Sequence, residues 1–246
     1  MFNKITNTLC AIITILTVVP MLIDGFNLYW VLGYVIIIAL IYSIPLWIKY
    51  GLTIKAIFLY YFGFQKYNVE LRETIYRFLT RTEMEHVKHF TIVSRINGLN
   101  EYSTRVGWSK DGELDIKPYN STQTIVRRWK NDKMTHLTLL FDRYYKKGEK
   151  IETGIMLDNL KDPEKESMLY LSTGIFENTK IVSLRIECPA NLKPTNIQLS
   201  FFKEYFDPYP TYTKQLSYNY EDEKIEFTDD FPIKGSKYMI TWEFNC

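Results

Sequence analysis

A basic stretch with interleaved aromatic residues is the part of this sequence whose residue types could do chemistry. Residues 125–150 contain eight Lys or Arg against three acidic residues. Guanidinium groups form two-point hydrogen bonds with phosphate oxygens, and aromatic rings stack on bases. The pattern therefore predicts a site for a phosphate-bearing, nucleotide-type ligand. The expected phosphate contacts are Arg127, Arg128, Lys130, Arg143, Lys146 and Lys147, and the expected stacking residues are Trp129, Tyr144 and Tyr145.

Two other interpretations fit the same basic stretch. Its cations could simply face water or a membrane surface on an ordinary hairpin. Residues 204–230 carry eight acidic residues against two Lys, so the basic stretch could also pair with the acidic one of a neighbouring chain and build a homo-oligomer. The formal net charge of +2 is too small to favour long nucleic acid as a partner.

Motifs of known catalytic chemistry are missing from the sequence. It contains no Gly-x-Ser-x-Gly, no phosphate-binding Gly-x-x-x-x-Gly-Lys-Ser/Thr and no Gly-x-Gly-x-x-Gly. His86 and His89 are three residues apart, which places them on opposite faces of a strand, and His136 stands alone. We therefore expect no catalytic residue, no metal site, no cofactor and no enzymatic activity.

Short runs of alternating apolar and polar residues fill the last two thirds of the chain. These runs contain the basic stretch, so the elements that they form must position it. Apolar residues recur at every second position, and turn sequences such as Asn97-Gly98, Lys147-Gly148 and Lys234-Gly235 separate the runs. This alternation predicts antiparallel strands with one buried face, closed into a β-sandwich or a barrel. The predicted strands are marked by Phe90/Ile92, Tyr102–Trp108, Leu137–Phe141, Ile151–Leu157, Val182–Cys188, Ile197–Phe201, Leu216–Tyr220, Ile225/Phe227 and Tyr238–Phe244. Trp108 and Trp242 are expected in the core.

The segment before these strands is predicted to be a connector. Residues 56–64 form an apolar patch that is too short to cross a bilayer, so it is expected to lie at the membrane interface. In residues 68–86, Leu71, Ile75, Phe78 and Leu79 follow helical spacing behind Asn68 as the N-terminal cap, which predicts an amphipathic helix.

The N-terminal residues are the most apolar part of the chain. Ile5–Ile23 holds 19 residues and Gly25–Ile48 holds 24, both without a charged side chain, and Asp24 separates them. A helix of about 20 apolar residues crosses the hydrocarbon core, so the two runs predict a transmembrane hairpin. Lys4, Lys49 and Lys55 flank the pair, while the turn has no Lys or Arg. The positive-inside rule then places the turn outside and both termini in the cytoplasm, with the two helices in contact with the lipid bilayer.

Taken together, these expectations define a fold class of membrane α-hairpin plus all-β. The two transmembrane helices occupy residues 1–50, the interfacial and amphipathic connector residues 51–85, and the cytoplasmic β domain residues 86–246. The β domain is an antiparallel β-sandwich or barrel.

This order of domains resembles the two-transmembrane β-barrel effectors of bacterial CBASS-type antiphage defence. The resemblance covers the whole chain as domain order, with no diagnostic residue motif. It implies a non-enzymatic antiphage effector at the inner membrane. There, a cyclic nucleotide ligand binds the β domain, chains oligomerise, and the hairpins disrupt the membrane. The alternative is a membrane-tethered adaptor whose β domain binds a protein partner and whose hairpin is a passive anchor.

Overall fold

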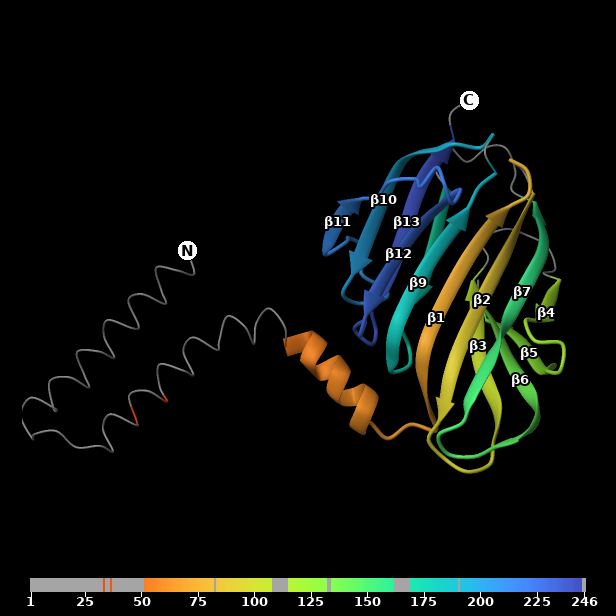
Figure 1. The fold of residues 1–246 in the computed structure, drawn as a ribbon, viewed down its shortest axis with the longest axis vertical. Helices are drawn as coiled ribbons and strands as arrows, with labels where there is room; N and C mark the ends of the chain where they lie inside the picture. Colours follow the sequence, from red (N-terminus) through yellow and green to blue (C-terminus); the bar gives the residue numbers. More distant parts are fainter. Residues whose placement is uncertain are drawn as a thin grey trace, which may run out of the picture. The chain divides into compact units, whose positions relative to one another are not determined.

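Thirteen strands dominate the described part of the computed structural model (Figure 1). The structure describes Gly33, Ile36 and residues 51–81, 83–107, 115–131, 134–161, 169–189 and 191–244. Residues 51–62 are helical, and the chain divides into two compact units, residues 1–55 and 56–246. The strands of the second unit are β1 (Tyr67–Phe78), β2 (Glu83–Ser94), β3 (Leu99–Gly107), β4 (Ile116–Pro118), β5 (Thr124–Asn131), β6 (Met134–Tyr145), β7 (Lys150–Lys161), β8 (Leu169–Gly174), β9 (Thr179–Glu187), β10 (Pro194–Phe202), β11 (Tyr212–Gln215), β12 (Lys224–Asp230) and β13 (Lys237–Phe244).

The strands form three sheets. We call them the large sheet (β12-β9-β1-β2-β7-β4), the four-stranded sheet (β11-β10-β13-β8) and the three-stranded sheet (β3-β6-β5). All pairs are antiparallel except β1 with β9, which is parallel. In Figure 1 the three-stranded sheet lies behind β2 and β7 of the large sheet.

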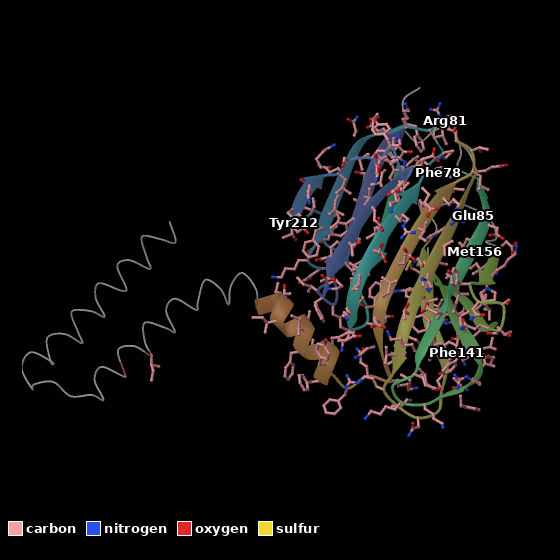
Figure 2. The ribbon with its side chains drawn as sticks, in the orientation of Figure 1. Phe78, Arg81, Glu85, Phe141, Met156 and Tyr212 are labelled. Carbon is pink, nitrogen blue, oxygen red and sulfur yellow. The ribbon has the colours of Figure 1, made fainter. Side chains whose placement is uncertain are left out.

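Both smaller sheets pack against the same face of the large sheet. From the four-stranded sheet, Trp242 meets the ring of Phe78, labelled in Figure 2, at 6.0 Å. From the three-stranded sheet, Tyr102 meets Phe90 at 5.1 Å. One cluster of buried apolar residues, including all four of these, fills the space between the layers. The second layer of this sandwich is therefore divided between two sheets, with β3 at the edge of one and β8 at the edge of the other.

Most of the strands predicted from alternation are confirmed. Alternate residues of β7 and β9 are buried as expected, and Trp242 is 1% exposed. The predicted turns at Gly98, Gly148 and Gly235 have φ of 84°, 89° and 92°, a region that glycine enters without steric cost. The strand predicted at Leu216–Tyr220 is wrong, because β11 ends at Gln215. Trp108 lies outside the described residues.

The amphipathic helix predicted for residues 68–86 is wrong. These residues form β1 and the first part of β2, paired from Tyr67↔Ser94 to Phe78↔Met84. The buried face of β1 carries Arg72 and Thr74 besides Tyr76 and Phe78. Because two of these four residues are polar, the alternation of apolar and polar residues that marks a strand is not visible in the sequence. The boundary predicted after residue 85 accordingly falls inside β2.

The membrane part of the predicted fold class also needs correction. Among the described residues no helix is long and apolar enough to cross a membrane. The helix at residues 51–62 would extend only about 18 Å, against about 30 Å for the hydrocarbon core. The predicted spans, Ile5–Ile23 and Gly25–Ile48, lie outside the described residues except for Gly33 and Ile36. Within the described residues the fold class is therefore corrected to mostly β, and the structure supports neither the two-span hairpin nor the inner-membrane location.

A cationic pocket between two strand edges

A pocket of about 410 Å³ opens where the second layer divides. Its floor is the inner face of β1 and β2. One wall is the edge of β3 and the other is the edge of β8, which contribute Ser103, Thr104, Arg105 and Gly107 and Leu169, Tyr170, Ser172 and Gly174. The fold thus places a cavity between two sheet edges, and the side chains in that cavity define the candidate site.

Two cations rise from the floor and each binds a different wall. The guanidinium of Arg72 donates to the carbonyl of Gly174 on β8 at 3.1 Å and pairs with the carboxylate of Glu177. The ammonium of Lys88 donates to the carbonyl of Arg105 on β3 at 3.0 Å. Arg72 and Lys88 therefore anchor both strand edges to the floor.

Lys88 is poised to change its protonation state. Burial, together with the nearby charges of Arg72 and Arg105, lowers its pKa to about 7 despite the opposing attraction of Glu177. Among the described residues no carboxylate lies within ion-pair distance of its ammonium. An anion entering this pocket would supply the missing partner.

A third cation closes one end of the pocket. The guanidinium of Arg105 stacks over the ring of Phe176 at 3.3 Å, and Tyr205 packs on Phe176 at 5.0 Å. Burial lowers the pKa of Arg105 from its usual range, although this residue remains a cation at neutral pH. Among the described residues that line the pocket, Glu177 is the one carboxylate, against the cations Arg72, Lys88 and Arg105. This closed end is therefore electropositive.

The remainder of the lining is apolar with a few unsatisfied donors. Tyr76, Phe78, Met84 and Leu169 lie toward the other end of the pocket. His86 and Trp242 are 3% and 1% exposed, and in the described structure neither ring nitrogen of His86 nor Nε1 of Trp242 has a hydrogen-bond partner. Burial lowers the pKa of His86 well below its usual range, so the ring is neutral. A buried polar atom without a partner is costly, and a bound ligand could satisfy these atoms.

The basic residues predicted from sequence lie elsewhere. Arg127, Arg128, Trp129 and Lys130 are on β5, an edge strand whose side chains are mostly exposed. Trp129 stacks on His136 at 3.8 Å, and His136 reaches the rim of the cationic pocket.

The second half of the predicted site is on and after the end of β6. Arg143 pairs with Glu149 at 3.2 Å and lies over the ring of Tyr145 at 4.1 Å. Tyr144 is 70% exposed, and Lys146 and Lys147 are exposed in the turn before β7. The structure thus does not gather these residues around the cationic pocket, and Arg143 already has a carboxylate partner.

Arg72, Lys88 and Arg105 escaped the sequence analysis for different reasons. Arg72 lies within residues 68–86, whose apolar spacing predicts a helix, and Arg105 falls between the alternating positions that mark the predicted strand Tyr102–Trp108. A usable signal existed on β2, since the spacing of Phe90 and Ile92 extends backward to Lys88 and His86 on the buried face. A lysine and a histidine on the buried face of a strand are a candidate site.

His89 belongs to a different cluster on the opposite face of the large sheet. Its ring lies 3.4 Å from the carboxylate of Glu73, contacts that of Glu152 and packs on Tyr119 at 4.7 Å. His86 and His89 thus occupy opposite faces of β2, as their spacing predicted. The described residues include no group of three or more His, Cys, Asp or Glu side chains placed to hold a metal ion.

Comparison with known proteins identifies no family for this chain. No family model and no curated protein matches the sequence. Among solved structures, a candidate protease from Parabacteroides distasonis aligns with a TM-score of 0.46 at 8% identity, over 72% of this chain and 40% of its own. An M1 zinc metallopeptidase from Deinococcus radiodurans aligns with a TM-score of 0.36 at 10% identity, over 72% and 42%. The chain thus spans about two fifths of the length of these structures, and neither likeness bears on its function.

Proposed function

We propose that the β domain is a binding module for an anionic ligand, held at the closed end of the pocket between β3 and β8. The observation that supports this most strongly is the cation group itself. Arg72, Lys88 and Arg105 lie in one cavity, and Glu177 is the single carboxylate that the described part of the chain places there. Buried charges are normally paired, and an unpaired ammonium is destabilising unless a ligand completes it.

The ligand must carry phosphate or carboxylate oxygens at one end and an apolar body at the other. The oxygens would contact Lys88 and Arg105, and the body would lie over Tyr76, Phe78 and Trp242. Pockets of a few hundred Å³ that combine apolar lining with a few polar groups are typical of small-ligand sites. The nucleotide-type ligand expected from the sequence stays within this proposal, with its site moved from β5 and β6 to this pocket.

A calorimetric titration of the full chain with pyrophosphate and with a cyclic dinucleotide tests the proposal. We expect saturable binding of at least one of them at pH 7, weakened about tenfold or more in Lys88→Met and in Arg105→Gln. Arg127→Gln removes a cation of β5 that does not line this pocket, so it should bind like the wild type. Binding that survives Lys88→Met and Arg105→Gln but is lost in Arg127→Gln would instead support the site predicted from sequence. An absence of binding by both anions would contradict the proposal.

A further inference from the structure

The two walls of the pocket are strand edges without a neighbouring strand. Within the described residues, β3 pairs only with β6 and β8 pairs only with β13. An edge strand presents a row of unpaired N–H and C=O groups, and native proteins usually cover or pair such edges. Here the two edges face the same cavity, so their backbone groups become part of its lining.

Hydrogen bonds define which residues of β8 face the cavity. The N–H of Ile175 donates to Ser236, next to β13, and the carbonyl of Gly174 accepts from Arg72 in the pocket floor. Successive residues of a strand direct their backbone groups to opposite sides. Gly174, Ser172 and Tyr170 therefore present N–H and C=O groups to the cavity, and all three line it together with Leu169.

The same spacing holds on β3. The carbonyl of Arg105 accepts from Lys88, and Ser103, Arg105 and Gly107 all line the cavity two residues apart. Both walls thus carry backbone donors and acceptors at alternate residues, the arrangement that an extended chain needs on either side. Of these groups, the carbonyls of Arg105 and Gly174 already accept from Lys88 and Arg72.

The direction of β8 follows from its contacts with β1. Gly174 bonds to Arg72, whereas Leu169 pairs with Trp242, whose ring contacts Phe78. Leu169, at the start of β8, therefore lies near Phe78 at the end of β1, and Gly174, at the end of β8, lies near Arg72 in the middle of β1. The two strands thus run in opposite directions.

The direction of β3 follows from its contacts with β2. Tyr102 packs on Phe90, and Arg105 accepts from Lys88, so β3 runs opposite to β2. Since β1 and β2 are antiparallel, β3 and β8 are antiparallel to each other across the cavity. Arg105 and Gly174 mark its cationic closed end, and Gly107 and Leu169 lie toward the other end.

We infer that the anionic ligand is an extended peptide segment that adds as a strand between β3 and β8 and ends in a free carboxylate at Lys88 and Arg105. This inference rests on the proposed function and names its ligand class. Two sheet edges supply main-chain hydrogen bonds that a nucleotide would leave unused, and strand addition of this kind is a common mode of peptide binding. The carboxylate matches the cations at the closed end. Side chains at alternate positions of the peptide would lie on Tyr76, Phe78 and Trp242, so apolar residues are favoured there.

Fluorescence anisotropy of the full chain with a labelled peptide tests the inference. The probe is fluorescein-Gly-Thr-Val-Thr-Val with a free carboxylate. Its matched controls are the same peptide with an amidated C-terminus and with N-methylated alternate amides. We expect the free carboxylate to bind at least about tenfold more tightly than the amide, and N-methylation to abolish binding. Equal binding of all three peptides would overturn the inference.

A proline variant distinguishes the contribution of the backbone hydrogen bonds of β8 from that of the cations. Ser172→Pro removes an N–H that faces the cavity and is not used in the ladder with β13, a position where an edge strand tolerates proline. We expect this variant to lose the peptide and to keep pyrophosphate. Pyrophosphate binding without binding of any peptide would refute the strand-addition inference and leave the proposed function standing. If neither probe binds the wild type, both fail. The peptide controls do not depend on how the proline variant folds.

Discussion

The ammonium of Lys88 on β2 donates to the carbonyl of Arg105 on β3 at 3.0 Å, which joins the floor of the pocket to the edge of the three-stranded sheet. A buried ammonium that binds a neutral carbonyl, next to two guanidinium groups, is an unfavourable arrangement by itself. A bound anion would relieve that cost, which is why the proposed site favours an anionic ligand. The consequences of this arrangement are measurable in the protein without ligand as well as with it.

Lys88→Met should make stability less dependent on pH. The folded pKa of Lys88 is about 7, whereas a lysine in the unfolded chain titrates near 10.4. Between about pH 7 and pH 10.4 Lys88 is protonated in the unfolded state and neutral in the folded state. The free energy of unfolding of the wild type therefore increases as pH rises through this range. From pH 6 to pH 9 the free energy of unfolding should gain about 2.5 kcal/mol from this group, and Lys88→Met should lack that gain.

Urea unfolding at both pH values measures this difference. Lys150→Met is the matched control, since Lys150 is exposed and pairs with Glu70 at 2.7 Å. The control should keep the wild-type pH slope. An unchanged slope in Lys88→Met would show that Lys88 is not a buried, shifted group.

Arg72→Met should destabilise the domain strongly. Arg72 is 5% exposed, and its loss leaves Glu177 and the carbonyl of Gly174 without their donor. Breaking one side of a buried pair costs about 3 kcal/mol or more, and the double variant Arg72→Met/Glu177→Gln should recover part of that loss. Urea midpoints measure both effects. Arg77, whose side chain is 46% exposed, pairs with Glu85 and Glu187, and Arg77→Met should cost less than about 1 kcal/mol. Equal losses of unfolding free energy in Arg72→Met and Arg77→Met would contradict the claim that burial makes the Arg72 pair the more important one.

His89→Gln should remove a pH-dependent contribution of opposite sign. Burial opposes protonation of His89, but its hydrogen bonds and attraction to Glu73 and Glu152 outweigh it, so the pKa is raised. A raised folded pKa means that the stabilisation is complete below the unfolded value near 6.5 and is lost as pH rises through the folded value. The free energy of unfolding of the wild type should therefore exceed that of His89→Gln by on the order of 1 kcal/mol at pH 5.5, and by less at pH 8.5. Thermal or urea unfolding at these two pH values measures the difference. A gap that widens with pH would contradict the assignment.

The strands could largely be predicted from the sequence, whereas the candidate site could not. Alternating apolar residues such as Ile151, Thr153, Ile155 and Leu157 mark a half-buried strand whatever its partners are. β1 was missed because Arg72 and Thr74 occupy its buried face, so the residues that build the site are the ones that obscured its strand. Functional positions commonly break local sequence rules in this way.

The location of the pocket depends on topology that alternation does not encode. Arg72, Lys88, Arg105 and Gly174 come from four strands, and only the pairing order places β3 and β8 at facing edges. The sequence predicts a ligand site in the basic stretch on β5 and β6 because the charged residues there are adjacent in sequence. Exposed cations on an edge strand such as β5 also protect that edge from pairing with other chains.

The most direct test is the pKa of Lys88 itself, measured from the ¹³Cε chemical shifts of the labelled full chain, with the signal assigned by its absence in Lys88→Met. In the free protein this ammonium should titrate near pH 7. With saturating pyrophosphate or the free-carboxylate peptide its pKa should rise by at least one unit, because the bound anion supplies the partner that the cavity lacks. A Lys88 that titrates at the same pH with and without these anions would contradict the proposed anion site.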